Sequence, residues 1–111
     1  MWWGVLNIFM NNLYNVLKKN DEEVTIELSN EKHPIFMAHF PQYPVLPGFT
    51  LIDILAKVLS DKVEHIKYAK FIAHILPNDI LECKIKTNNK KRMIKVFKNN
   101  KKVSEISYES K

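Results

Sequence analysis

The feature that most constrains this chain is a run of three spaced prolines, Pro41, Pro44 and Pro47, followed at once by Gly48. Each proline fixes its φ angle and has no backbone N–H to donate, so this segment forms neither a helix nor a central strand. Residues 49–60 are then largely apolar and contain no proline or glycine. A helix that is apolar nearly all round is normally buried. The sequence therefore predicts an ordered loop that leads directly into a buried central helix.

Two ionisable residues lie on either side of the proline loop. Asp53 falls inside the expected helix, and acidic residues are seldom buried without a partner or a purpose. Desolvation by its apolar neighbours should raise its pKa and favour the protonated acid at neutral pH. His39, fourteen positions upstream, is the natural basic partner. Each residue alone is more often structural, but their joint spacing with the prolines and Gly48 favours an acid/base site.

Polar and apolar residues alternate in several other segments, as they do in half-buried strands. The expected strands are Glu22–Ser29, Lys67–Ile75, Ile80–Thr87, Arg92–Lys98 and Val103–Tyr108. The tetrapeptide Asn-Asn-Lys-Lys occurs twice, at Asn88–Lys91 and Asn99–Lys102, each time between two of these runs, as polar hairpin turns do. An antiparallel sheet wrapped around one buried central helix is an α+β fold.

The first ten residues are apolar, but this stretch is far shorter than the roughly 20 residues of a membrane span. It also has neither the basic start nor the small-residue cleavage site of a signal peptide. We therefore expect an N-terminal helix that runs to about Lys19, so that residues 1–20 are a helical segment and residues 21–111 form the main domain.

The central segment resembles the signature of a known family. His39-Phe40-Pro41, Pro44-Val45-Leu46-Pro47-Gly48 and Asp53 are similar to the motif of the hot-dog-fold 3-hydroxyacyl-[acyl-carrier-protein] dehydratases. Weaker matches follow at Lys70-Phe71, Pro77-Asn78-Asp79 and Asn100–Glu105. The resemblance covers residues 33–109 and implies a hot-dog fold.

The same resemblance implies an activity and its residues. A dehydratase of this family removes water reversibly from a 3-hydroxyacyl thioester to give the trans-2-enoyl thioester, in fatty-acid or related acyl-chain biosynthesis. His39 would be the base that removes the C2 proton, and Asp53 the acid at the departing hydroxyl. Gly48 would direct its backbone N–H at the thioester carbonyl. No metal or organic cofactor is implied, since acyl carrier protein presents the substrate on its phosphopantetheine arm.

Two positions depart from the family pattern. Ala38 stands where glycine or cysteine usually precedes the histidine, and Lys57 stands where glutamine usually follows the acid. Lys57 is spaced to pair with Asp53 at i,i+4 and to keep it ionised, which would make Lys57 a modulator of the site. Two alternatives therefore stay open: a non-catalytic hot-dog module that binds acyl carriers, and a hot-dog thioesterase whose helix-borne acid activates water.

The size and composition of the chain bear on its assembly and compartment. A chain of 111 residues forms a small domain that gains from oligomerisation, and in the family the histidine and the acid come from different protomers. A homodimer, or a higher oligomer, is therefore expected. The single cysteine, Cys83, allows no intramolecular disulfide, which favours a reducing compartment and hence the cytoplasm. The histidines and Cys83 lack zinc-ligand spacing, so no metal site is expected.

The net charge of +5 is unevenly distributed. Residues 1–56 contain three lysines and six acidic residues, whereas residues 57–111 contain fourteen basic and six acidic residues. A basic surface attracts an acidic partner, and the resemblance implies acyl carrier protein; a solvated lysine surface is the alternative. Nucleic acid fits less well, because Arg92 is the only arginine.

Overall fold

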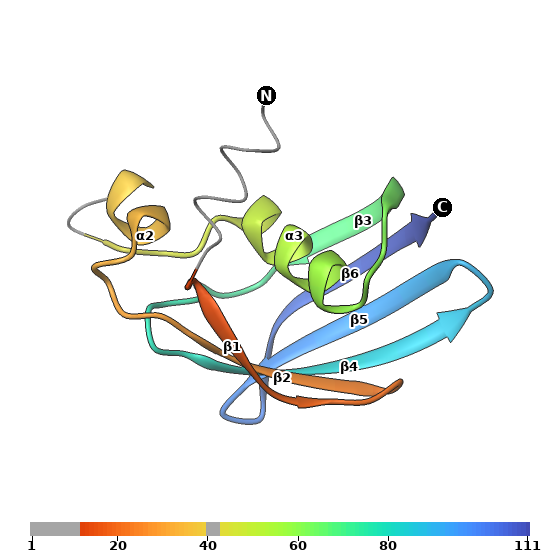
Figure 1. Ribbon diagram of the computed structural model, residues 1–111, viewed down its shortest axis with the longest axis horizontal. Helices are drawn as coiled ribbons and strands as arrows, with labels where there is room; N and C mark the ends of the chain where they lie inside the picture. Colours follow the sequence, from red (N-terminus) through yellow and green to blue (C-terminus); the bar gives the residue numbers. More distant parts are fainter. Residues whose placement is uncertain (1–11, 40–42) are drawn as a thin grey trace.

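The computed structural model describes residues 12–39 and 43–111, with the backbone alone at residues 38 and 39. Within these ranges the chain forms six strands and two helices (Figure 1). In chain order they are β1 (Tyr14–Lys19), β2 (Glu23–Leu28), α2 (Pro34–His39), α3 (Gly48–Val58), β3 (Val63–Phe71), β4 (Ile80–Asn88), β5 (Lys91–Lys98) and β6 (Lys101–Ser110).

The six strands form one antiparallel sheet in the order β1-β2-β4-β5-β6-β3. The helix α3 lies against one face of this sheet, as Figure 1 shows. β1 and β3 are the two edge strands. The fold is therefore the expected α+β arrangement, an antiparallel sheet that curves around a central helix.

The two Asn-Asn-Lys-Lys segments form the expected hairpin turns. Asn89 adopts a φ of 56° between β4 and β5, and Asn99 and Asn100 adopt φ values of 51° and 65° between β5 and β6. Asparagine tolerates this left-handed region better than most residues, and two consecutive positive φ angles are typical of the type I′ turn. These turns set the register of the meander and place Ile85, Ile94 and Ile106 side by side.

The strands β2, β4, β5 and β6 confirm their predicted segments to within two residues at each end. β3 differs, because it occupies Val63–Phe71 rather than Lys67–Ile75. The pairing with β6 stops at Phe71, and the N–H groups of Ile72 and Ala73 then both donate to the carbonyl of Val103, at 2.9 and 3.2 Å. This shared acceptor turns the chain away from the sheet.

The expected N-terminal helix is wrong from Tyr14 onward, since Tyr14–Lys19 is the edge strand β1, paired with β2. The apolar side chains of Val16 and Leu17 on this strand are 45% and 53% exposed. Backbone pairing with β2 has overridden the local helical pattern. The rest of the expected helix, in residues 1–11, lies outside the described residues.

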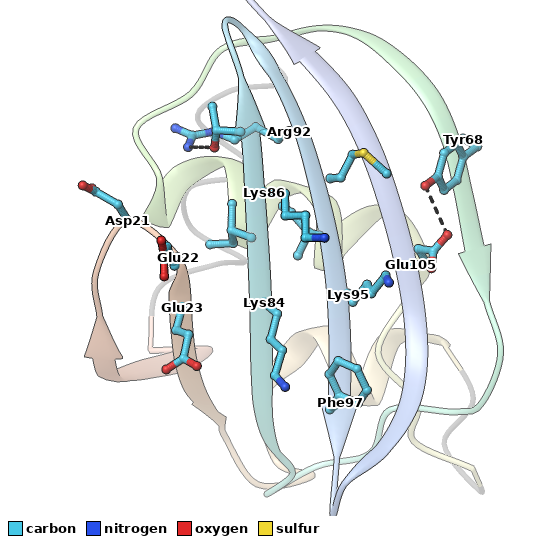
Figure 2. A pocket seen from close by; sticks show the side chains of 14 residues that line it. Asp21, Glu22, Glu23, Tyr68, Lys84, Lys86, Arg92, Lys95, Phe97 and Glu105 are labelled. Atoms are coloured by element: carbon cyan, nitrogen blue, oxygen red, sulfur yellow. Dashed lines mark hydrogen bonds between the residues drawn. The ribbon is translucent and has the colours of Figure 1, made fainter.

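The outer face of the sheet, away from α3, is polar. Figure 2 shows Lys84 and Lys86 of β4 and Lys95 of β5 on this face. They alternate with Cys83, Ile85, Ile94 and Val96, which are buried on the inner face. Side chains on a strand point alternately to the two faces of a sheet, so this sequence pattern fixes which face receives the helix.

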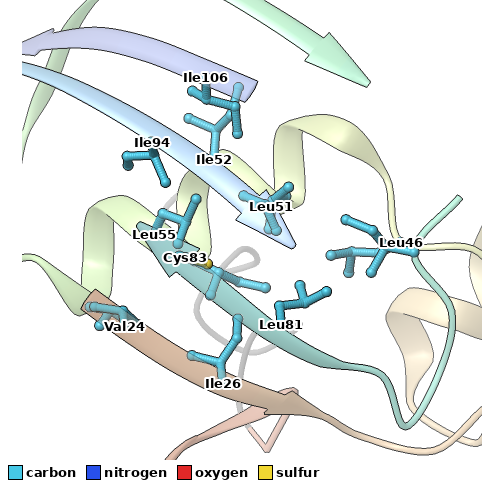
Figure 3. Packing of buried hydrophobic residues seen from close by; sticks show 14 of the residues in the cluster. Val24, Ile26, Leu46, Leu51, Ile52, Leu55, Leu81, Cys83, Ile94 and Ile106 are labelled. Atoms are coloured by element: carbon cyan, nitrogen blue, oxygen red, sulfur yellow. The ribbon is translucent and has the colours of Figure 1, made fainter. Parts of the chain in front are cut away.

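The core lies between α3 and the inner face of the sheet (Figure 3). From α3 the buried side chains are Leu51, Ile52, Ile54, Leu55, Ala56 and Val58. Among the described residues, no helix is long and apolar enough to cross a membrane. The central helix therefore forms as predicted, directly after residues 43–47, which are neither helix nor strand. The first part of the proline loop lies outside the described residues.

Candidate active site

The short helix α2 carries the predicted base. It begins at Pro34 and ends at His39, so the backbone position of His39 is set by this helix. Local periodicity did not predict α2, which spans only six residues. The side chain of His39 lies outside the described part of the structure, as do residues 40–42. The separation of His39 from Asp53 therefore stays a prediction.

Asp53 lies on the open side of α3 rather than in its buried part. Phe49, Asp53 and Lys57 follow one another at i,i+4 spacing, and all three side chains are exposed. Residues four apart share one face of a helix, and the remaining faces of α3 pack on the sheet. The expectation of a fully buried aspartate is thus wrong, because the sheet covers most of the helix but not this stripe.

The pKa of Asp53 is nevertheless shifted in the predicted direction. Partial burial raises the pKa of its carboxyl above the ordinary value of 3.8, because desolvation penalises the charged form. A close lysine ammonium would lower this pKa instead. The proposed influence of Lys57, one turn further along the helix, stays a prediction.

Gly48 is the first residue of α3 and follows Pro47, whose extended backbone has φ −61° and ψ 141°. Among the residues that the structure describes, no side chain caps this end of the helix. The N–H groups of a first helical turn have no acceptor within the helix, and together they form its positive end. Such N–H groups can stabilise negative charge that develops on a carbonyl oxygen.

The ring of Phe71, at the end of β3, lies directly over Gly48. A Cβ atom added to Gly48 would lie 2.5, 2.6 and 2.8 Å from three carbons of this ring. Only glycine permits so close an approach. The Phe71 ring is itself half exposed, and Phe49, the residue after Gly48 in α3, is 73% exposed. The start of α3 is therefore an open, apolar surface with uncapped backbone donors.

Sequence reasoning missed a polar cluster beyond the other end of α3. Arg92 of β5 donates two hydrogen bonds to Asp61, from Nε to Oδ2 at 2.8 Å and from an Nη to Oδ1 at 3.0 Å. The Tyr108 hydroxyl of β6 also donates to Asp61. Burial alone would raise the pKa of Asp61, but the hydrogen bonds from Arg92 and Tyr108 hold it below 3.8. The one sequence signal was that Arg92 is the only arginine.

This cluster differs chemically from an acid/base site. Asp61 is held ionised by two donors, and Arg92 has a further acceptor in the Thr87 hydroxyl at 2.9 Å. A carboxylate stabilised in this way neither gives nor takes a proton near neutral pH. The cluster therefore anchors the end of α3 to the sheet.

A broad hollow on the outer face of the sheet carries charges of both signs (Figure 2). The acidic and basic residues that line it are Asp21, Glu22, Glu23, Lys84, Lys86, Arg92, Lys95 and Glu105. Asp53 and Gly48 are not among its lining residues, so this hollow is separate from the open start of α3. Within residues 12–39 and 43–111, no group of three or more histidine, cysteine, aspartate or glutamate side chains is placed to hold a metal ion.

The sequence of this chain matches a known protein family. A family model described as ApeI-like, ApeI dehydratase, matches residues 16–109. The 3-hydroxyacyl-[acyl-carrier-protein] dehydratase FabZ of Ehrlichia ruminantium (strain Gardel) is 27% identical over 88 residues, covering 66% of this chain and 61% of that protein. FabZ of Streptococcus thermophilus is 32% identical over 80 residues, covering 60% and 57%. The chain thus spans about three fifths of the length of these curated relatives.

Solved structures support the fold. A chain of the dehydratase heterocomplex ApeI:P from Xenorhabdus doucetiae is similar with a TM-score of 0.69 at 22% identity, covering 86% of this chain and 93% of that one. The PaaI protein of E. coli is similar with a TM-score of 0.64 at 9% identity, covering 97% and 90%. At these identities the likeness shows the fold alone, and it confirms the hot-dog architecture expected from the sequence.

Proposed function

The chain belongs to the ApeI-like dehydratase family, and from this premise we propose that it removes water from a 3-hydroxyacyl thioester carried by acyl carrier protein. The product is the trans-2-enoyl thioester, in fatty-acid or related acyl-chain biosynthesis. The observation that carries the proposal is the placement of Asp53, with its raised pKa, on the open stripe of the helix that starts at Gly48.

Each group has one task in this reaction. His39 takes the proton from C2, and the electron pair of that C–H bond forms the C2–C3 double bond. The C3–O bond breaks at the same time, and Asp53 gives its proton to the departing hydroxyl, which leaves as water. Burial supports this role of Asp53, because a raised pKa increases the fraction of protonated acid.

The start of α3 supplies electrostatic stabilisation. As the C2 proton leaves, partial negative charge develops on the thioester carbonyl oxygen in the transition state, and the Gly48 N–H is proposed to donate a hydrogen bond to it. The positive end of the helix acts in the same direction. Phe71, which lies over Gly48, forms an apolar wall beside this position.

We propose a homodimer as the active form. β3 is an edge strand, and its Val63 and Ile66 side chains are 36% and 42% exposed. The unpaired backbone groups of an edge strand can pair with the same strand of a second copy, and these exposed apolar side chains would then be covered. The basic second half of the chain supports acyl carrier protein as the further partner. The single, buried Cys83 suits a reducing cytoplasm.

The test is a direct assay of dehydration. Purified protein is mixed with a 3-hydroxyacyl thioester of acyl carrier protein, and the conjugated enoyl thioester is followed by its ultraviolet absorbance. We expect the His39→Ala variant to lose about 10²- to 10⁴-fold in rate, the usual contribution of a general base. The His74→Ala variant, which removes an exposed histidine, is the matched control and should keep the wild-type rate. Equal rates for wild type and His39→Ala would refute the role of His39.

The same assay separates the two alternatives. Ala38 and Lys57, which depart from the family pattern, favour a non-catalytic module that binds acylated carrier without turnover. Binding of the carrier without any enoyl product would support that function. Release of free thiol from acyl thioesters would instead identify a thioesterase, with the Asp53 carboxylate activating water.

A further inference from the structure

The residue before α2 is a histidine that acts as a helix cap. The N–H of Ile35 donates to Nδ1 of His33 at 3.1 Å. The carbonyl of His33 accepts from the N–H groups of Phe36 and Met37, at 3.0 and 3.1 Å. A side chain that accepts from the first turn while its own carbonyl starts the helix is the N-cap, a position that aspartate, asparagine, serine and threonine usually occupy.

This contact restricts one nitrogen of the imidazole. Nδ1 accepts a hydrogen bond only when it carries no proton, so the contact requires the tautomer with the ring proton on Nε2. The side chain is also buried, with 9% of its surface exposed.

α2 depends on such a cap because it is short. A helix of six residues is not stable by itself in water, since so few hydrogen bonds offset the cost of nucleation. Three features hold it: Phe36 is fully buried in the core, Ile35 packs against the core, and Pro34 at the first helical position has no N–H to leave unpaired. The cap by His33 sets the first turn, and the last residue of the same helix is His39.

We propose that His33 is a positioning residue, whose imidazole caps α2 and thereby sets the backbone position of His39 relative to α3. This inference rests on the proposed function, because it assigns His33 a consequence for the reaction of His39. His33 touches no reacting atom. Its effect on rate comes from placement, where a displacement of about 1 Å costs up to 10²-fold.

The experiment compares a cap-competent variant with a cap-deficient one. His33→Asn offers an amide oxygen that can accept from the first turn, whereas His33→Ala removes the acceptor. We expect kcat to fall about tenfold or more in His33→Ala, with little change in KM, and to return to within about threefold of wild type in His33→Asn. His74→Ala again serves as the control histidine variant.

Two structural measurements complete the test. Nitrogen chemical shifts of the His33 ring should show an unprotonated Nδ1 in the wild-type protein. Hydrogen exchange at the Ile35 amide should be faster in His33→Ala than in wild type or His33→Asn. A protonated Nδ1, unchanged exchange at Ile35, or equal kcat in His33→Asn and His33→Ala would each overturn the proposal.

The outcome is separable from that of the proposed function. A wild-type protein without dehydratase turnover would overturn the proposed function and, with it, the catalytic consequence of the cap. The tautomer and the exchange rate at Ile35 would still decide whether His33 caps α2. Turnover that depends on His39 but not on the cap would overturn the further inference alone.

Discussion

The two ends of α3 differ in how their polar groups are hydrogen-bonded. At its C-terminal end the N–H groups of Leu59, Ser60 and Asp61 all donate to carbonyls of the last turns, at 3.0, 3.2 and 2.8 Å. The Asp61 carboxylate just beyond is held by Arg92 and Tyr108. The N-terminal end begins at Gly48, where no side chain of residues 12–37 or 43–111 forms a cap, and it carries exposed apolar rings.

This difference separates a structural polar cluster from a candidate site. A polar group whose hydrogen bonds are all made within the chain contributes stability and has no capacity left for a ligand. Uncapped N–H groups and a carboxyl with a raised pKa are left available for another molecule. The two aspartates differ in the direction of their pKa shifts: the pKa of Asp61 is lowered by its ion pair, and the pKa of Asp53 is raised by desolvation.

The largest expected effect is on activity, at Asp53. Asp53→Asn removes the proton donor, and we expect the dehydration rate to fall about 10²- to 10³-fold. Stability should change by no more than about 0.5 kcal/mol, as for other exposed positions. Its direction at pH 7 should be upward, because a carboxyl whose pKa is raised on folding disfavours the folded state once it ionises. Enoyl thioester absorbance and urea unfolding measure the two quantities, and a variant with wild-type turnover would contradict the site.

Substitution of Asp61 should instead have its main effect on stability. Asp61→Ala leaves Arg92 and Tyr108 without their shared acceptor, so we expect a loss of about 2 to 4 kcal/mol in the free energy of unfolding. The matched control is Glu109→Ala, which removes an exposed ion pair with Lys67 and should cost much less than Asp61→Ala, because water screens such a pair. Urea unfolding provides the measurement. If the two variants lost equal free energy of unfolding, the cluster of Asp61, Arg92 and Tyr108 would not anchor the helix.

The contact between Gly48 and Phe71 should appear as coupling between two substitutions. Gly48→Ala places a methyl group within the Phe71 ring, which must shift; because the ring is half exposed, we expect a cost at or below the lower end of the about 1 to 3 kcal/mol that overpacking costs in a core. Phe71→Leu makes room, so the double variant should lose less than the sum of the single variants. Additive losses in a double-mutant cycle would mean that the ring moves away from Gly48 freely.

The smallest effect is the pH dependence of the anchor. The pKa of Asp61 is lower in the folded protein than its ordinary value of 3.8, so its ionised form stabilises the fold at pH values above 3.8. This contribution is lost as the pH falls below 3.8 and the carboxylate becomes protonated. The stability difference between wild type and Asp61→Asn should therefore be complete at pH 7 and shrink at pH 3. Unfolding curves at both pH values test it, and a constant difference would contradict the ion pair.

Local sequence patterns determined much of this protein. The three prolines and Gly48 determined where α3 starts, and the apolar run after them determined that it is largely buried. Alternation determined which faces of β2, β4 and β5 are buried, and asparagine pairs determined two turns. These features depend on residues within a few positions of each other, so a single sequence contains the whole signal.

Tertiary structure alone decided the rest. β1 is a strand because it pairs with β2. α2 forms because Phe36 is buried and His33 caps its first turn. The Phe71 ring contacts Gly48 from the end of β3. Asp61, Arg92 and Tyr108 come from three separate parts of the chain. Contacts between distant residues depend on which surfaces the fold brings together, and the periodicity of a short segment contains no information about its distant partner.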